Sequence, residues 1–258
     1  MLRSRIIPCL LVHNKGLVKT VNFKDPKYVG DPINAVKIFN EKEVDELIVL
    51  DIDASAERRG PNFEMIKNLA AECRMPFCYG GGVTSVEEAK KIISLGAEKV
   101  ALSTTALINT SMLFEIGSAI GIQSVVVVID VRKKSILSGG GYEIYYNNGK
   151  TKASIKLKDF IHQLNKIGVG EIVINSIDQD GTMKGYDMQL ISLIRELTDF
   201  PITAIGGAGS LLDIKTLIQK FKIIGASAGS LFVFKGKYRA VLINYPNREE
   251  KTKFFKEI

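Results

Sequence analysis

The sequence is poor in the residues that build most metal sites and nucleophile–base triads. It contains two histidines, His13 and His162, and three cysteines, Cys9, Cys73 and Cys78, in 258 residues. So few histidines argue against a histidine-rich metal site and a Ser-His-Asp triad, and we expect neither a metal nor a cofactor. The cysteines form no CxxC pair, which favours reduced thiols and a cytoplasmic protein. Proton transfer is therefore expected to depend on carboxylates.

Long apolar runs are also missing. No run approaches the roughly 18 residues that a membrane span requires, so we expect no membrane-spanning segment. Arg3 and Arg5 precede an apolar run at 6–12, an arrangement that superficially matches a signal peptide. Because this run is short and no small-residue cleavage site follows it, we predict a first strand there instead.

Basic side chains outnumber acidic ones, 35 to 28, which gives a net charge of +7. The lysines are scattered along amphipathic segments rather than gathered in one tract, which argues against nucleic-acid binding. A modest basic excess instead suits phosphorylated small-molecule ligands.

Short β-branched runs alternate with segments of helical period along the whole chain. The helical segments carry apolar residues three and four positions apart, and the strand candidates are nearly continuous apolar runs. The length suits one α/β barrel or two small domains, and eight such strands favour a closed parallel barrel. We therefore predict a single (β/α)8 (TIM) barrel domain over residues 1–258. Its strands are expected at 5–10, 47–52, 76–80, 99–102, 124–130, 171–176, 201–205 and 223–227, with helices at 62–73, 86–95, 157–167, 188–197 and 211–220.

The longest interruption of this alternation follows the fifth predicted strand, at about 133–154. It contains GGGYEIYYNNGK, in which apolar and polar residues alternate before an Asn-Asn-Gly turn signal. This pattern is typical of a β-hairpin, so we predict a hairpin inserted in the loop after the fifth strand.

The two halves of the sequence resemble each other. The stretch ELIVLDID, which begins at Glu46, matches EIVINSID, which begins at Glu171, in its apolar pattern. A glycine run follows each stretch at a similar distance, and then a hydroxyl-bearing residue. The last spacing is 23 residues in both halves, from Gly81 to Thr104 and from Gly207 to Ser230. This register predicts two related half-barrels, each with an equivalent ligand site.

Glycines and hydroxyl side chains follow several strands at the predicted carboxyl end of the barrel, where such barrels bind ligands. Glycine allows an anion close to the backbone, and a helix N-terminus supplies free N–H groups. One glycine cluster alone would equally fit a plain strand-to-helix turn, but here the cluster is duplicated. We therefore predict two phosphate sites and a ligand with a phosphate at each end. The residues are Gly81, Gly82, Ser103 and Thr104 in one half, and Gly206, Gly207, Gly229 and Ser230 in the other.

A family resemblance runs through nearly the whole chain. The segments IIPCL, VNF, GDP, DEL-VLDI-AS, GGGV, VVVVIDVR, EI-I-SID-DGT--GYD and IGGAG occur in this order. With them the chain resembles the HisF-type cyclase subunit of imidazole glycerol phosphate synthase. The resemblance implies a TIM barrel that forms a heterodimer with a HisH-type glutaminase subunit. Such a barrel receives ammonia from the glutaminase and uses it on a bisphosphorylated ribonucleotide in histidine biosynthesis, in a lyase-type cyclisation.

In that family, aspartates after the first and fifth strands act as general acid and base. Asp130 supplies the fifth-strand carboxylate, whereas Leu11 occupies the first-strand position. Leucine cannot transfer a proton, and the loss of a positioned acid or base typically lowers the rate by about 10² to 10⁴. His13 lies two residues further along, about 6–7 Å away, so its rescue of the reaction is disfavoured. Leu11 therefore argues against full cyclase activity.

Other family positions are retained. The resemblance assigns ligand contact or loop closure to Lys19, Asn22, Asp51, Asp180, Gly181 and Thr182. It also assigns an ammonia gate at the strand beginnings to Arg5, Glu46, Lys99 and Glu171. Charges at strand starts are often ordinary solvated termini. Two cations and two anions that converge on one axis do not fit this explanation, because partly buried ions are costly unless they are paired. Their convergence therefore favours a retained gate.

The chain also departs from the family pattern. Ser103 stands where the family usually has asparagine, and Asp53 where it commonly has a hydroxyl residue. The C-terminal GKYRAVLINYP is similar to a second group of such barrels, extra copies found beside a true cyclase. Those copies accompany a glutaminase and an amidotransferase that converts N-acetyl sugars of surface glycans to acetamidino sugars.

Three functions are therefore open. The first is an active imidazole glycerol phosphate synthase subunit, which Asp130 favours and Leu11 opposes. The second is a barrel that activates a glutaminase and conducts ammonia to another enzyme, in sugar amidation. The third is a related phosphosugar isomerase, which would also need both aspartates. We favour the second for the physiological role.

Overall fold

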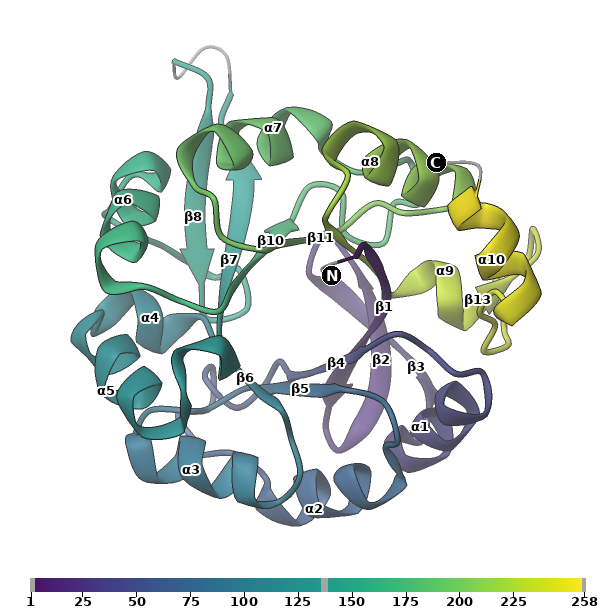
Figure 1. The fold of residues 1–258 in the computed structure, drawn as a ribbon, viewed down its shortest axis with the longest axis horizontal. Helices are drawn as coiled ribbons and strands as arrows, with labels where there is room; N and C mark the ends of the chain where they lie inside the picture. The colour runs from purple at the N-terminus through teal and green to yellow at the C-terminus, as the bar shows by residue number, and fades with distance from the viewer. Residues whose placement is uncertain (1–2, 136–138, 257–258) are drawn as a thin grey trace.

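Within residues 3–135 and 139–256, which the computed structural model describes, eight parallel strands pair in a closed ring (Figure 1). The ring closes because β1 pairs with both β12 and β4, and β7 pairs with both β6 and β10. This closed parallel barrel confirms the predicted TIM barrel, and each predicted strand is present within a few residues. The strands are β1 Arg5–His13, β4 Leu47–Asp51, β5 Phe77–Gly80, β6 Lys99–Leu102, β7 Val125–Lys133, β10 Glu171–Ser176, β11 Ile202–Ile205 and β12 Gly225–Ala228.

Helices surround the ring, and all but α10 have buried residues that pack against it (Figure 1). All five predicted helices form, and capping boxes fix the starts of α3 and α8 in the two halves. The short α4 and α9 follow β6 and β12, so the halves also match in structure. The helices are α1 Pro32–Glu41, α2 Phe63–Glu72, α3 Val86–Ser94, α4 Thr104–Ile108, α5 Ser111–Ile120, α6 Leu157–Ile167, α7 Met188–Leu197, α8 Leu211–Phe221, α9 Ser230–Val233 and α10 Arg248–Lys256, with a 3-10 turn at Ile122–Ser124.

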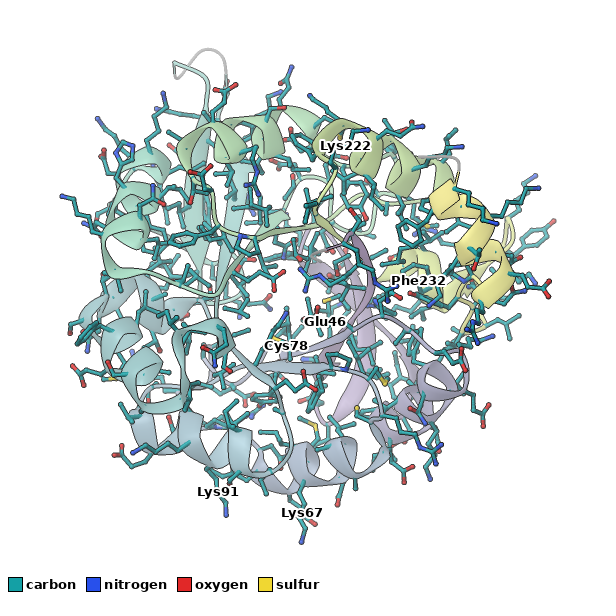
Figure 2. The ribbon with its side chains drawn as sticks, in the orientation of Figure 1. Glu46, Lys67, Cys78, Lys91, Lys222 and Phe232 are labelled. Atoms are coloured by element: carbon teal, nitrogen blue, oxygen red, sulfur yellow. The ribbon has the colours of Figure 1, made fainter. Side chains whose placement is uncertain are left out.

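The barrel strands are buried on both faces, which explains their near-continuous apolar sequences. One set of alternate side chains packs outward against the helices. The other set points inward and forms a second apolar cluster on the barrel axis: Ile7, Cys9, Ile48, Cys78, Ala101, Val126, Val128, Val173 and Ile205. Figure 2 shows the contrast, because Glu46 and Cys78 point toward the axis, whereas Lys67 and Lys91 project into solvent.

An antiparallel hairpin that the sequence analysis did not predict follows β1. It consists of β2 Gly16–Val21 and β3 Lys24–Gly30, and β2 pairs with the extended end of β1. Asn14 and Lys15 make the first turn with φ of 49° and 64°, a left-handed pair of the kind that two-residue hairpin turns require. The first strand therefore continues to His13 rather than ending at residue 10.

The predicted hairpin after the fifth barrel strand is present. Its first arm is the end of β7 itself, which runs to Lys133 and pairs with β8, Tyr142–Tyr146. The predicted Asn-Asn-Gly turn then leads to β9, Thr151–Lys152.

The C-terminal segment returns from one barrel end to the other. After α9 it forms a small hairpin, β13 Phe234–Lys235 and β14 Ala240–Val241, and then reaches α10 beside the N-terminal ends of the strands (Figure 1). Among the described residues, no helix combines the length and apolar character that crossing a bilayer would require.

Candidate functional site

A cavity opens at the carboxyl ends of the barrel strands, as predicted, and most of the predicted ligand residues line it. Asn22 and Thr182 are exceptions. The Asn22 amide instead donates to the carbonyls of Ile177 and Asp178 at 3.1 and 2.8 Å, so it anchors the first hairpin. The predicted residues that line the cavity are Leu11, Lys19, Asp51, Gly81, Gly82, Ser103, Thr104, Asp130, Asp180, Gly181, Gly206, Gly207, Gly229 and Ser230.

Asp130 is a buried carboxylic acid on the inner face of β7. The amide nitrogen of Asn175 donates to its Oδ1 at 3.0 Å. Burial raises the pKa of Asp130 to about 7, and the negative charge of Asp180 adds to the rise, although the Asn175 hydrogen bond opposes it. A carboxyl group with a pKa near neutrality can both donate and accept a proton at physiological pH.

Leu11 occupies the corresponding position on β1. It lies opposite Leu50 in the β1–β4 register, packs on the axial cluster and lines the same cavity as Asp130. The wall formed by Leu11 and Leu50 is therefore apolar. His13, further along β1, does not line the cavity, and its Nδ1 lies 2.7 Å from Oδ1 of Asp53. The histidine is thus engaged outside the cavity and does not substitute for a carboxylate at residue 11.

The predicted phosphate cradles have similar backbone geometry in the two halves. Gly82 and Gly207 have φ of 73° and 105°. A Cβ atom at Gly82 would lie 2.4 Å from the carbonyl oxygen of Arg59, and one at Gly207 would lie 2.0 Å from the carbonyl oxygen of Gly185. Close backbone packing therefore requires glycine at both positions. Within the described residues, neither amide donates a hydrogen bond.

Hydroxyl groups and a cation complete the two cradles. Buried Ser103 Oγ lacks a hydrogen-bond partner among the described residues, and Thr104 begins α4 beside it. In the other half, Ser230 begins α9 after Gly229. Lys19 Nζ lies so close to Gly229 that a Cβ atom there would be 2.5 Å away. Both cradles thus offer donors to an anion, and the second also offers an ammonium group.

Lys19 reaches the second cradle from the first hairpin. Its Nζ donates to the carbonyl of Cys9 at 2.6 Å, and the side chain is buried. Burial lowers the pKa of Lys19, while Asp180 partly opposes this shift. An anion in the cradle would favour the charged ammonium.

The first hairpin is fastened over the cavity by the loop after β10. Thr20 Oγ1 donates to Oδ2 of Asp180 at 2.6 Å, and the Phe23 amide donates to the same oxygen at 3.1 Å. A Cβ atom at Gly181 would lie 2.0 Å from the Thr20 carbonyl, so the hairpin backbone packs directly on this loop. Asp180 and Gly181 therefore hold the hairpin in place.

Asp51 is held by an arginine that the sequence analysis did not identify. Arg59 makes a two-pronged contact to its carboxylate, at 2.8 and 2.9 Å. The carboxylate also accepts from the amides of Asp53 and Ala54. Because the Arg59 carbonyl packs on Gly82, this ion pair also shapes the first cradle.

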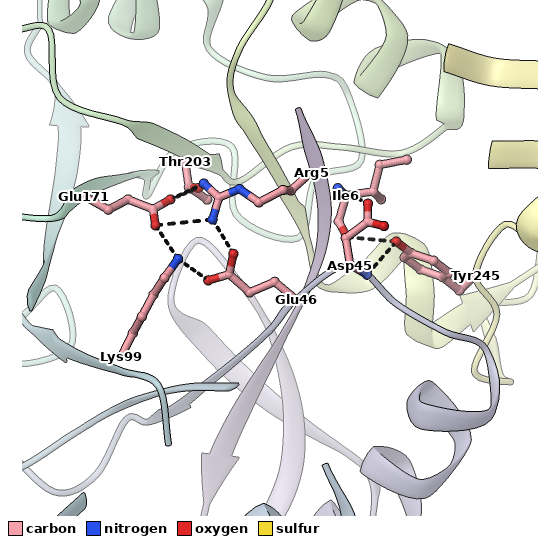
Figure 3. A network of polar contacts seen from close by, with 8 residues as sticks. All are labelled: Arg5, Ile6, Asp45, Glu46, Lys99, Glu171, Thr203 and Tyr245. Atoms are coloured by element: carbon pink, nitrogen blue, oxygen red, sulfur yellow. Dashed lines mark hydrogen bonds and ion pairs between the residues drawn. The ribbon is translucent and has the colours of Figure 1, made fainter. Parts of the chain in front are cut away.

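Arg5, Glu46, Lys99 and Glu171 meet on the barrel axis at the opposite end, and we call them the charged ring (Figure 3). Lys99 Nζ lies 2.6 Å from Glu46 and 2.8 Å from Glu171, and Arg5 bonds Glu171 at 2.7 Å and also contacts Glu46. Thr203 Oγ1 donates to Glu171 as well. Burial alone would raise the pKa of Glu171, but the charges of Arg5 and Lys99 outweigh it and lower the pKa to about 2.

The predicted residues therefore fall into two groups at opposite barrel ends, with the axial apolar cluster between them. Asn175, Thr203 and Arg59 were not identified from the sequence. Asn175 and Thr203 lie on the inward-facing positions of predicted strands, so strand alternation could have found them. Within the described residues, no group of three or more histidine, cysteine or acidic side chains is placed to hold a metal ion.

Comparisons with known proteins agree with this geometry. A family model described as "Histidine biosynthesis protein" matches residues 5–239. The chain is 53% identical to "Putative imidazole glycerol phosphate synthase subunit hisF3" of Vibrio vulnificus (strain YJ016), over 98% of this chain and 96% of that protein. It is 52% identical to "Putative imidazole glycerol phosphate synthase subunit HisF" of Leptospira borgpetersenii, over 99% of this chain and 100% of that protein. It is 38% identical to "Imidazole glycerol phosphate synthase subunit HisF" of Lactococcus lactis subsp. cremoris (strain MG1363), over 90% and 89%.

Proposed function

The chain belongs to the histidine biosynthesis protein family, among its HisF-type members, and from this we propose that it is the synthase subunit of a two-chain glutamine amidotransferase. A HisH-type glutaminase docks over the charged ring and releases ammonia into the barrel. The ammonia passes along the axis to the cavity at the carboxyl ends of the strands. The barrel acts chiefly as an ammonia conduit that supplies the amidation of an N-acetyl sugar, rather than as a cyclase.

One contrast between the barrel ends supports this proposal. The charged ring is complete, with each of its carboxylates bound by both of its cations. At the other end, Leu11 replaces the carboxylate that would face Asp130 across the cavity. A chain that retains the entrance for ammonia but lacks half of its acid–base pair is suited to transfer ammonia more than to consume it.

The axial cluster between the ends supports passage of the neutral molecule. Its side chains are apolar or thiol groups, and they offer no charge to stabilise an ammonium ion. Moving an ion through such surroundings is far more costly than moving a small neutral molecule. The barrel interior would therefore pass ammonia and exclude ammonium.

The ligand that the cavity best fits is a bisphosphorylated small molecule, one phosphate at Gly82 and Thr104, the other at Gly207 and Ser230. The free amides and the ammonium of Lys19 support this assignment. An anion in the second cradle would also pair with Lys19 and so help to hold the first hairpin closed. We place the protein in the cytoplasm, in keeping with its free thiols at Cys9, Cys73 and Cys78.

A second candidate function is an active imidazole glycerol phosphate synthase cyclase. The pKa of about 7 at Asp130 favours it, because this value suits a general acid or base near neutral pH. The two candidates differ in whether Leu11 prevents turnover.

The test supplies the isolated chain with ammonium salt and the histidine-pathway ribonucleotide. We expect the wild type to turn over about 10² to 10⁴ times more slowly than the Leu11→Asp variant, since that variant regains the second carboxylate. Leu50→Asp is the matched control, because Leu50 lies opposite Leu11 and lines the same cavity but belongs to the neighbouring strand β4. Wild-type turnover that equals that of Leu11→Asp and clearly exceeds that of Leu50→Asp would favour the cyclase instead.

A further inference from the structure

Arg5 begins β1 and Glu46 directly precedes β4, and these two strands are not joined by ladder hydrogen bonds at the charged ring. The β1–β4 ladder runs from Cys9 opposite Ile48 to Val12 opposite Asp51. Arg5 and Glu46 precede its first row. Their convergence therefore depends on contacts other than the regular sheet.

Tyr245 bridges the two strand starts at this point (Figure 3). Its hydroxyl donates to the carbonyl of Ile6 at 2.9 Å and accepts from the amide of Asp45 at 3.3 Å. Ile6 and Asp45 are the chain neighbours of Arg5 and Glu46. The ring of Tyr245 is buried and packs on Phe232, with 5.2 Å between ring centroids. A single hydroxyl thus replaces missing ladder bonds directly beside the charged ring.

Asp45 completes the bridge and connects it to the C-terminal helix. Its Oδ2 accepts from the Ile6 amide at 2.9 Å, and its Oδ1 lies 3.1 Å from Lys251 Nζ on α10. Lys251 also donates to the Glu43 carbonyl at 2.7 Å and lies over the Tyr245 ring. The C-terminal segment therefore reaches the charged ring through Asp45 and Tyr245.

We propose that Tyr245, acting with Asp45, is a positioning residue for the ammonia gate. It holds the starts of β1 and β4 at the separation at which Arg5 and Glu46 meet Lys99 and Glu171. The role of the charged ring as a gate rests on the function proposed above, but the positioning itself does not. Loss of the hydroxyl would loosen the ring locally and leave the rest of the barrel intact.

The first arm of the test uses the isolated chain, so its result does not depend on whether a glutaminase binds. Tyr245→Phe keeps the ring and removes only the hydroxyl. Labelling of Lys99 by a small amine-reactive reagent, located by peptide mass spectrometry, reports opening of the charged ring. We expect about a fivefold faster reaction of Lys99 in Tyr245→Phe, the effect of losing one buried hydrogen bond.

Two controls separate positioning from general destabilisation. Tyr186→Phe removes a comparable buried hydroxyl, which donates to the Ser227 carbonyl at 3.0 Å away from the charged ring. Lys19, buried at the other barrel end, is an internal control in every variant. An unchanged Lys99 rate in Tyr245→Phe, or an equal rise at Lys19, would overturn the proposal.

The second arm adds the glutaminase. The Tyr245→Phe complex should bind and hydrolyse glutamine within about twofold of the wild type while it releases more ammonia to solvent in the presence of the acceptor enzyme. A purely structural defect would lower binding and hydrolysis together, which would count against a positioning role. If the wild-type chain binds no glutaminase, the proposed function fails, and the Lys99 labelling still decides the role of Tyr245.

Discussion

At the scale of single residues, Asp130 is suited to proton transfer, although Leu11 stands at the position proposed for a second carboxylate. It is held by Asn175, faces the cavity and has a pKa of about 7, because burial and nearby Asp180 disfavour its charge. A group with such a pKa destabilises the folded state once it must ionise. The presence of a carboxylic acid at residue 130 is therefore not explained by its contribution to packing or stability.

This cost predicts a stabilising substitution with a defined pH dependence. Between its ordinary pKa near 4 and its folded value near 7, Asp130 is protonated when folded but ionised when unfolded. The folded state binds the extra proton, so stability falls as pH rises across this interval and levels off above it. Asp130→Asn removes the effect and can keep the contact to Asn175. The gain in free energy of unfolding should be about 2–3 kcal/mol larger at pH 8 than at pH 5.

Urea unfolding of both proteins at the two pH values measures this difference. A gain of equal size at pH 5 and pH 8 would mean that Asp130 is ionised in the fold throughout, and that the cavity is more polar than the structure indicates.

At the scale of elements, the first hairpin covers the cavity on the side of the second cradle. β2 and β3 carry Lys19 to the second cradle, and Asp180 and Gly181 fasten them in place. The hairpin thus serves both as a lid and as the source of the cation. The hairpin supplies no such cation to the first cradle, so the two proposed phosphate sites should differ in their dependence on Lys19.

Crystals grown in phosphate should show an anion at Gly82 and Thr104 and another at Gly207 and Ser230. In Lys19→Met, we expect the second site to lose about tenfold or more in affinity, since a charge-assisted hydrogen bond is removed. The first site should be unchanged and serves as the control. Phosphate should also raise the melting temperature of the wild type more than chloride at equal ionic strength. Two empty cradles at high phosphate would contradict the bisphosphate ligand.

The barrel itself could be predicted from the sequence because its signals are local. Strands buried on both faces are apolar throughout, and helices that cover them repeat their apolar residues at helical spacing. The hairpin β2–β3 was missed because β3, with KDPKYVG, is almost entirely exposed and has no apolar alternation. Its pairing depends on the turns at 14–15 and 22–23, whose left-handed residues are not glycine.

The candidate site could be predicted in part for a similar reason. The duplicated glycines and strand-end residues have positional signatures, and the structure brings most of them to one cavity. Strand alternation places Asn175 on the inward face of its strand. Which residue Asn175 contacts could not be predicted, and neither could the role of Tyr245, because these partners come from distant parts of the chain. Asn175 lies beside Asp130, and Tyr245 lies beside Ile6, although 45 and 239 residues separate these pairs.

At the scale of the whole molecule, the charged ring and the cavity lie at opposite barrel ends, with the axial apolar cluster between them. In the proposed function, the charged ring receives ammonia, the apolar axis excludes ammonium, and the cavity delivers the ammonia onward. Lys99→Ala leaves Glu46 and Glu171 with Arg5 as their remaining cation in the ring, so two buried carboxylates share one positive charge. Such a ring should open or distort, because breaking a buried pair leaves an uncompensated charge.

The most direct test of this account follows the amide nitrogen of glutamine. The chain, its cognate glutaminase and the sugar amidotransferase are mixed with the N-acetyl sugar and with ATP, which activates the amide oxygen that ammonia displaces. The mixture also contains glutamine labelled with ¹⁵N in the amide and excess unlabelled ammonium. The account predicts a stable heterodimer, stimulated glutamine hydrolysis and ¹⁵N in the acetamidino sugar. With Lys99→Ala, hydrolysis should continue while the label in the sugar falls toward that of bulk ammonium. Absence of a complex at micromolar concentrations, or sugar as poorly labelled with the wild type as with Lys99→Ala, would contradict it.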